Sequence, residues 1–174
     1  YVCCGKIEGY EDYRYVASDH KKAIKDAMEH LFLLGHRKIG IFTQNDSSVV
    51  EQTRKKGIEE ICEKYAVEEK NLTYIEFPAE SSDQKIYGIW MEHLKQERRP
   101  TAYIISTAIR QQFQLAAQTL GLSIPEDISY VNIEYYRRSN SEEENQTRVV
   151  SKADIVAETA FKKLLRVIYN PASE

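Results

Sequence analysis

Hydrophobic residues along the chain alternate between the spacing typical of helices and the short runs typical of buried strands. Between Asp19 and Gly35 they recur at helical intervals, with Asp19 as a predicted N-cap and Gly35 as the left-handed stop. An apolar run at 39–43 then has the length of a strand. The chain therefore begins a helix–strand alternation within its first quarter.

The same alternation continues to the end of the chain. Further strands are predicted at 73–77, 103–106 and 128–133. Apolar faces indicate helices across 58–65, 86–94, 109–120 and 156–168, and a long polar segment, 135–146, precedes a short strand-like run at 148–150. This pattern predicts an α/β fold with a mostly parallel, doubly wound sheet that carries helices on both faces.

Composition narrows the class of protein. The 174 residues are 42% hydrophobic and 29% charged, as in ordinary globular proteins, and the net charge is −3. Nucleic-acid binding relies on clustered Lys and Arg, so we do not expect this chain to bind DNA itself. No apolar run reaches the length of a membrane span, and we expect no membrane partner. The chain opens on Tyr1 without a methionine, so we expect the front of the natural protein to be missing.

Catalytic and metal-binding patterns find no support in the sequence. The seven glycines form no phosphate-binding loop, and no serine lies in a nucleophile elbow. No histidine or cysteine has a second ligand at metal-binding spacing, so neither a metal nor a cofactor is expected. The cysteine count is odd and two cysteines are adjacent, which favours unbridged thiols in a reducing, cytoplasmic compartment.

A set of short motifs, in this order and spacing, resembles the effector domain of LacI/GalR-type transcription regulators. The resemblance covers nearly the whole chain. The motifs are Val16-x-x-Asp19, Gly35-His36-Arg37-Lys38-Ile39, Arg54-x-x-Gly57, Pro100 to Ile104, Leu120 to Ser129, and Ala157 to Phe161 with Leu164-Leu165.

The resemblance implies a type I periplasmic-binding-protein-like fold with two lobes, a small ligand in the cleft between them and a homodimer. It also implies a DNA-binding module that is absent from this chain. We expect one lobe to be complete and the other partial. The predicted boundaries are 1–41 for the partial N-terminal lobe, 42–147 for the C-terminal effector-binding lobe, and 148–174 for a crossing strand and final interlobe helix.

Ligand contacts are expected in the loops that follow the carboxyl ends of the strands, because open α/β sheets bind ligands there. The family's contacts fall in the same loops. The candidate residues are Arg54, Glu134, Ser106, Thr107 and Phe77. Arg54 offers a planar fork of donors for paired hydroxyls, although an exposed helix arginine beside two lysines is the alternative. Glu134 is a hydroxyl acceptor or an ordinary loop carboxylate.

The other candidates also have plain structural alternatives. Ser106 and Thr107 either bind ligand or cap the next helix, and Phe77 either stacks on a sugar or packs in the core. Several of these positions depart from the family, which usually has Asn-Asp where this chain has Ser106-Thr107. It usually has Gly-Phe-Asp where this chain has Asn132-Ile133-Glu134.

The sequence predicts an effector-sensing and dimerisation domain of a sugar-responsive transcription regulator rather than an enzyme. Ligand-driven closure of the lobes is expected to change operator binding. The alternative is a periplasmic or lipid-anchored sugar-binding protein of the same fold. A further alternative is a cleft that has lost its ligand and only supports a dimer.

Overall fold

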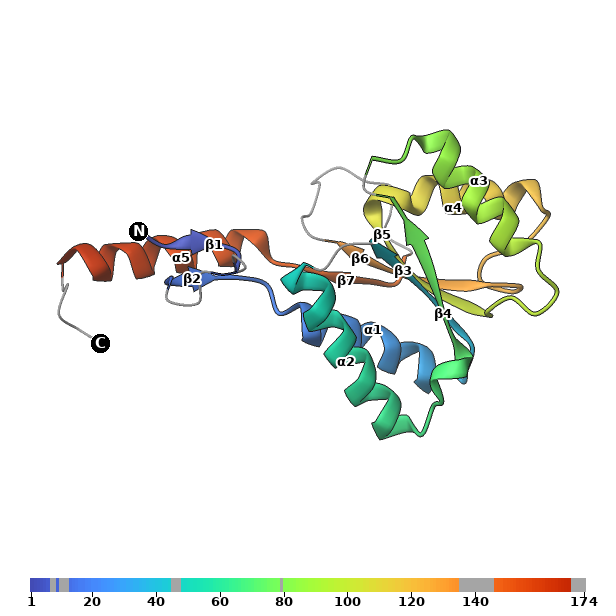
Figure 1. The fold of residues 1–174 in the computed structure, drawn as a ribbon, viewed down its shortest axis with the longest axis horizontal. Helices are drawn as coiled ribbons and strands as arrows, with labels where there is room; N and C mark the ends of the chain where they lie inside the picture. The colour runs from blue at the N-terminus through green and yellow to red at the C-terminus, as the bar shows by residue number, and fades with distance from the viewer. Residues whose placement is uncertain (7–8, 10–12, 45–47, 79, 135–145, 170–174) are drawn as a thin grey trace.

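The main lobe is a parallel sheet with a pair of helices on each face, and a narrow arm extends from one end of it (Figure 1). The computed structural model describes residues 1–6, 9, 13–44, 48–78, 80–134 and 146–169. Part of the polar segment predicted at 135–146 therefore lies outside the described residues. The sheet and its helices confirm the predicted α/β class.

Five strands form the sheet in the order β4-β3-β5-β6-β7, and all neighbouring pairs are parallel. Their bounds are β3 (Ile39–Gln44), β4 (Leu72–Phe77), β5 (Ala102–Ser106), β6 (Ser129–Glu134) and β7 (Arg148–Val150). The chain runs from β3 outward to β4 and then returns to the other side of β3 to form β5. This reversal of direction is the place where open parallel sheets bind ligands, beyond the carboxyl ends of the strands. We call that side of the sheet the carboxyl edge.

Helices α1 (His20–Leu33) and α2 (Val49–Tyr65) cover one face of the sheet. Helices α3 (Asp83–Leu94) and α4 (Thr107–Thr119) cover the other, and the short 3₁₀ helix η1 (Glu69–Asn71) leads into β4 (Figure 1). Each face has its own hydrophobic cluster because residues alternate sides along the strands. Ile39 and Ile41 of β3 point to α1 and α2, while Phe42 points to α3 and α4.

The helix ends follow the predicted signals. Asp19 caps α1, accepting a hydrogen bond from the Lys22 backbone N–H at 2.8 Å. Gly35 has a φ of 92° just after that helix, a conformation that favours glycine. Ser48 and Ser82 cap α2 and α3 in the same way as Asp19 caps α1. These caps fix where each helix begins and so where the loops of the carboxyl edge end.

The arm consists of a parallel pair of two-residue strands, β1 (Cys3–Cys4) and β2 (Tyr15–Val16), with helix α5 (Ala153–Tyr169) packed on them (Figure 1). Two segments join it to the main lobe, one before α1 and one after β7. They meet where the hydroxyl oxygens of Ser18 and Ser151 lie 2.5 Å apart, a hydrogen bond. The arm is therefore connected to the main lobe through two chain segments that lie side by side.

Strand pairing and helix packing continue across the expected boundaries at 41/42 and 147/148. The expected boundary at 41/42 falls inside β3, and α1 packs against α2 and against strands of the main sheet. The run at 148–150, expected as the crossing strand that leads to the final helix, is the fifth strand of the sheet, β7, and pairs with β6. The reason is that pairing and packing are set by distant residues, which hydrophobic spacing does not report.

Helices α1 and α2 approach closely at Gly57. A Cβ atom at this position would lie 2.7 Å from Cγ2 of Ile24 and 2.9 Å from the carbonyl oxygen of Lys21. Glycine is thus required by space rather than by backbone angle. The close approach ties α2 to α1, and it bears on the cavity described below.

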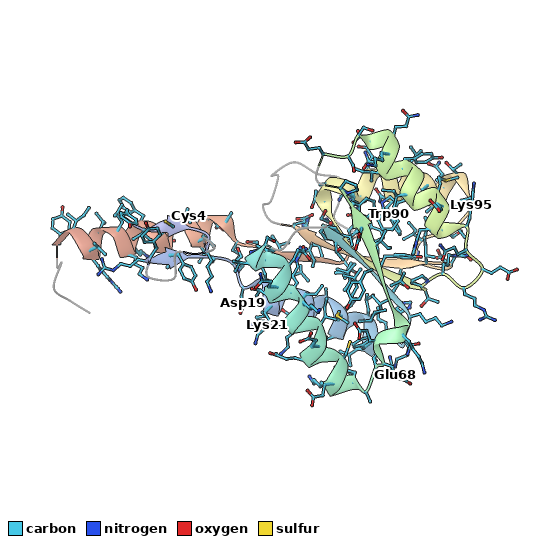
Figure 2. All side chains as sticks on the ribbon, viewed as in Figure 1. Cys4, Asp19, Lys21, Glu68, Trp90 and Lys95 are labelled. Carbon is cyan, nitrogen blue, oxygen red and sulfur yellow. The ribbon has the colours of Figure 1, made fainter. Side chains whose placement is uncertain are left out.

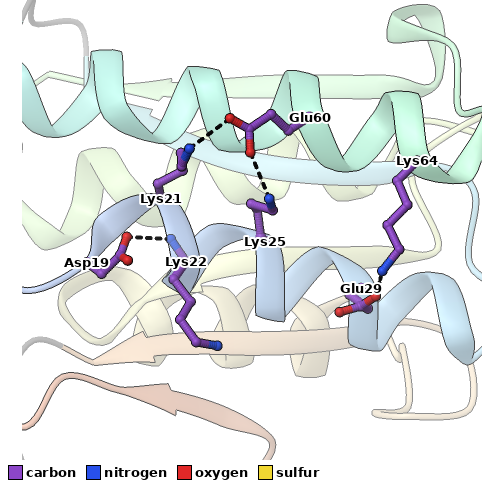
Figure 3. Close-up of polar contacts among 7 residues, drawn as sticks. All are labelled: Asp19, Lys21, Lys22, Lys25, Glu29, Glu60 and Lys64. Carbon is purple, nitrogen blue, oxygen red and sulfur yellow. Dashed lines mark hydrogen bonds and ion pairs between the residues drawn. The ribbon is translucent and has the colours of Figure 1, made fainter.

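The same two helices are joined at their surface by charged pairs (Figure 3). The Glu60 carboxylate of α2 accepts hydrogen bonds from Nζ of Lys21 at 2.8 Å and of Lys25 at 2.7 Å, both on α1. Nζ of Lys64 pairs with the Glu29 carboxylate at 2.5 Å. The two lysines lower the pKa of Glu60 from 4.5 to about 2. Because these groups are exposed or only partly buried, we expect their contribution to stability to be small.

We expect Glu60→Gln to lower the free energy of unfolding slightly at pH 6, with the difference from the wild type shrinking as the pH falls. A folded pKa below the unfolded value means that Glu60 contributes above about pH 4.5 and loses that contribution on descent toward pH 2. Urea unfolding between pH 6 and pH 3 measures the difference. Glu59→Gln, which removes the adjacent exposed carboxylate outside the pairs of Figure 3, is the matched control. An effect of Glu60→Gln that is constant with pH would contradict this assignment.

The remaining features bear on the class of protein. Among the helices that the structure describes, none combines the length and the hydrophobicity needed to cross a bilayer. Cys3, Cys4 and Cys62 are free thiols, with Cys4 exposed on the arm (Figure 2). Cys62 is half-buried against the core between α1, α2 and the sheet, and burial raises the pKa of its thiol.

Candidate ligand site at the carboxyl edge

Buried polar side chains gather near the carboxyl ends of the central strands. Arg54 is 5% exposed, Glu134 is 4% exposed and Asn132 is fully buried. Arg54 lies in the second turn of α2, which follows β3, and the other two lie at the end of β6. Burying charged and polar groups costs free energy unless they are paired, so their partners determine what this edge can do.

Arg54 is held in place by its own helix and by an aromatic ring. Its Nη1 atom donates to Oε1 of Glu51 at 2.7 Å, an i,i+3 ion pair in the first turns of α2. The guanidinium carbon lies 5.0 Å from the centroid of the Phe42 ring, within the range of a cation–π contact. These two contacts hold the Arg54 guanidinium in a defined position.

His20, the first residue of α1, lies close enough to Arg54 to feel its charge. Burial is the main cause that lowers the pKa of its imidazole, and the nearby positive charge of Arg54 lowers it further. The imidazole is consequently neutral at pH 7 and presents one donor and one acceptor. His20 directly follows the chain segment that joins the arm to α1, so this connecting segment ends near Arg54.

A second group of contacts centres on Asn132. Its Nδ2 atom donates to Oε1 of Glu134 at 3.1 Å and to Oγ1 of Thr107 at 3.2 Å. The other carboxylate oxygen of Glu134 lies 3.7 Å from Nη1 of Arg148, at the start of β7. The side-chain amide of Asn132 thus links the ends of β5, β6 and α4.

Two buried acceptors near this edge have no hydrogen-bond donor among the residues that the structure describes. They are Oδ1 of Asn132 and Oε1 of Gln112, in the second turn of α4. A buried acceptor without a donor is costly, and such groups commonly meet a water molecule or a ligand. Hydroxyl groups supply the missing donors, so these acceptors favour a ligand rich in hydroxyls.

The predicted site residues therefore fall into three groups. Arg54 lies beside Glu51, while Glu134 and Thr107 are joined through Asn132. Ser106 is buried at the N-cap position of α4, but its side chain makes no capping hydrogen bond. The ligand role of these four residues stays a prediction.

Phe77 has a different environment. It is 3% exposed and its ring lies 5.1 Å from that of Trp90, inside the core beneath α3. This is the packing alternative weighed for Phe77, because residues of β4 alternate sides and Phe77 points to the α3 face. The Phe77 ring therefore belongs to the hydrophobic core on that face of the sheet.

A cavity of about 410 Å³ lies beside Arg54, between α2 and the sheet. Its volume is within the range of small-molecule sites, about 300–1,000 Å³. Arg54, Glu51 and Thr43 line it on the side of the carboxyl edge. The strand ends near Arg54 are thus hollow rather than filled by apolar side chains.

Sequence reasoning did not propose Glu51, Asn132 or Gln112 as residues of the ligand site. Glu51 could have been found from its i,i+3 spacing to Arg54 on a helix. Asn132 carries a clearer signal, because an amide inside an otherwise apolar strand needs a partner. Gln112 gives no such signal, since polar residues are common on helices.

Residues 28–174 match the family model described as "Periplasmic binding protein-like domain". No curated protein matches the chain. Among the described residues, no group of His, Cys, Asp or Glu side chains is arranged to hold a metal ion.

Several solved structures share the fold. A LacI family transcriptional regulator from Enterococcus faecium, solved with bound ribose, has a TM-score of 0.79 at 22% identity, over 99% of this chain and 62% of its own. A regulatory protein of the LacI family from Chloroflexus aggregans has a TM-score of 0.82 at 20% identity, over 99% and 62%. A LacI family transcription regulator from Clostridium acetobutylicum has a TM-score of 0.78 at 18% identity, over 99% and 64%.

This chain spans between 62% and 64% of the length of these three structures, in agreement with one complete lobe and one partial lobe. The family match covers most of the chain, including Arg54, Asn132 and Glu134. The fold agrees with the resemblance seen in the sequence. The chain belongs to the periplasmic binding protein-like domain family and has the fold of LacI-type regulator effector domains.

Proposed function

We propose that this chain is the effector-sensing part of a cytoplasmic, DNA-binding transcription regulator. A sugar or sugar derivative binds at the carboxyl edge, and the DNA-binding module lies outside this chain. The observation that carries the proposal is the burial of three polar side chains near the carboxyl edge: Arg54 of α2, and Asn132 and Glu134 of β6. The family match and the ribose-bound relative of the same fold support it.

The chemistry of the site suits a polyhydroxylated ligand. The Arg54 guanidinium is a donor, while Glu134 and Oδ1 of Asn132 are acceptors. Each sugar hydroxyl both donates and accepts, so a sugar can satisfy both kinds of group. The contacts of the described site residues include no nucleophile–base pair, and we propose binding rather than catalysis.

Signalling requires that the ligand contacts one state of the protein better than another. We propose that the ligand bridges the main lobe and the lobe to which the arm belongs, and that their closure alters how a homodimer presents its DNA-binding modules. The paired segments at Ser18 and Ser151 are the connection about which the lobes move. Allosteric couplings of about 1–3 kcal/mol correspond to roughly five- to 150-fold changes in affinity, which is sufficient for regulation.

Calorimetric titration of the full-length protein tests the proposal. The panel comprises ribose, glucose and galactose, their phosphates, and nucleobases. We expect saturable binding of at least one sugar or sugar phosphate, and a change in DNA affinity when that compound is present. A protein that binds none of these compounds contradicts the proposal and favours a cleft that only supports a dimer.

A secreted or lipid-anchored sugar-binding protein of the same fold is the second candidate, because the family's fold serves both roles. The same titration detects its ligand. The residues preceding Tyr1 separate the two candidates, since a leader peptide indicates transport and a helix-turn-helix module indicates regulation.

A further inference from the structure

The cavity beside Arg54 extends from the carboxyl edge into the space between α2 and the sheet. Residues of β3, β4, β5, β6, α1 and α2 line it. Helix α2 is tied to α1 by the close approach at Gly57 and by the charged pairs of Figure 3.

The inner wall of this cavity is apolar. Five isoleucines from five different elements form it, and each is nearly fully buried: Ile24, Ile41, Ile58, Ile104 and Ile133. Isoleucine side chains neither donate nor accept hydrogen bonds. A hydroxyl group placed against this wall would lose its water partners without gaining new ones. The inner wall therefore favours an apolar group over the sugar ring itself.

The rim of the cavity is polar and carries both signs of charge. Arg54 and Lys55 supply donors, and Glu51, Glu69 and Glu76 supply acceptors. Tyr74 also lines the cavity, near Glu69, and burial raises the pKa of its phenol to about 12, so it keeps its proton. A rim of mixed charge favours a neutral group with several hydroxyls over a strongly charged one.

We propose that the effector is an amphiphilic glycoside, with its sugar at the rim near Arg54 and its apolar aglycone between the five isoleucines. This inference rests on the proposed function and adds the chemical class of the ligand. The cavity volume of about 410 Å³ accommodates a group of the size of a phenyl ring together with part of the sugar.

Methyl NMR of the full-length protein tests the apolar half directly. With isoleucine δ1 methyl groups labelled and benzyl alcohol as the probe, we expect shifts at Ile41, Ile58 and Ile104. The control methyl groups belong to Ile86 and Ile105, which are buried on the opposite face of the sheet. Shifts confined to the control group, or no saturable shift, overturn the proposal.

Calorimetry with matched glycosides tests the whole ligand. The probes are the methyl and phenyl β-glycosides of ribose, glucose and galactose. For the sugar that binds, we expect the phenyl glycoside to bind about ten- to a hundredfold more tightly than the methyl glycoside, the gain typical of burying a phenyl group.

A variant that fills the cavity completes the test. Ile58→Trp places a large ring on the α2 wall, and we expect it to remove the preference for phenyl over methyl. Lys56→Trp introduces the same ring on the exposed side of α2, away from the cavity, and is expected to keep the preference. The methyl NMR experiment on the unaltered protein decides the question if Ile58→Trp does not fold.

The outcomes separate the two proposals. Equal binding of methyl and phenyl glycosides overturns the aglycone assignment and leaves the proposed function standing. An absence of binding by every sugar and glycoside in the panel overturns both. A phenyl preference that Ile58→Trp removes and Lys56→Trp keeps supports both.

Discussion

Replacement of Arg54 by alanine is expected to weaken sugar binding by on the order of a hundredfold, because hydrogen bonds to a charged group contribute about 1.5–3 kcal/mol. The guanidinium is buried and already fixed by Glu51 and by the Phe42 ring, so little ordering is needed when the ligand binds. Its removal also leaves the Glu51 carboxylate without this partner. Calorimetric titration with the sugar identified in the screen measures the loss.

Two further variants serve as controls for the Arg54→Ala result. Arg54→Lys keeps the charge but loses the planar fork, and we expect an affinity between those of the wild type and Arg54→Ala. Lys56→Ala removes an exposed cation two positions along the same helix and is expected to leave affinity unchanged. Thermal unfolding by circular dichroism checks that Arg54→Ala remains folded. Full affinity in a folded Arg54→Ala protein would exclude Arg54 from the site.

Replacement of Trp90 by alanine is expected to lower the free energy of unfolding by about 3–5 kcal/mol, the usual cost of truncating a large buried aromatic residue. Trp90 is fully buried between α3 and the sheet, in the main lobe of Figure 2. Its ring lies 4.9 Å from Phe113, 5.1 Å from Phe77 and 5.8 Å from Tyr103. The variant loses all three aromatic contacts and leaves a cavity.

Urea unfolding followed by circular dichroism measures this effect, since Trp90 is the sole tryptophan and its fluorescence is lost in the variant. Trp90→Phe is expected to cost less, because it keeps most of the ring contacts and removes an indole N–H that has no acceptor among the described residues. Tyr87→Ala, on the same helix but only partly buried, is the control for truncation. A Trp90→Ala protein as stable as the Tyr87→Ala protein would contradict this account of the core.

Much of the fold could be predicted from the sequence because its signals are local. Asp19 and Gly35 mark the ends of α1 through a side-chain cap and a left-handed backbone. The predicted strand at 39–43 corresponds to β3, and the run at 128–133 corresponds to β6. Alternation of such elements is sufficient to predict a parallel sheet covered on both faces.

The assignment of elements to lobes depends on distant contacts, which local sequence signals do not report. Helix α1 packs on strands β5, β6 and β7, which lie about 70 to 130 residues farther along the chain. β7 joins the sheet through Asn132, Ile133 and Glu134 of β6. No periodicity within α1 or β7 indicates these partners.

The sequence predicted individual residues of the candidate site, but not the side chains with which they form hydrogen bonds. The strand-end rule and the family resemblance both pointed to Arg54 and Glu134, and the structure places both in buried positions near the carboxyl edge. Phe77 was a less informative choice, because an aromatic residue at a strand end can face either side of the sheet. Which face it takes follows from the register of β4 with β3, which depends on both strands.

Hydrogen–deuterium exchange of the full-length protein, with and without the bound sugar, tests the central claim most directly. We predict that the sugar protects amides at the start of α2 (48–54), at the β5–α4 junction (106–107) and at the end of β6 (132–134). The turns at the opposite edge of the sheet, 35–38 and 121–127, are expected to exchange at the same rate in both states. Protection confined to those opposite turns, with none at the carboxyl edge, would contradict the claim that this edge holds the ligand.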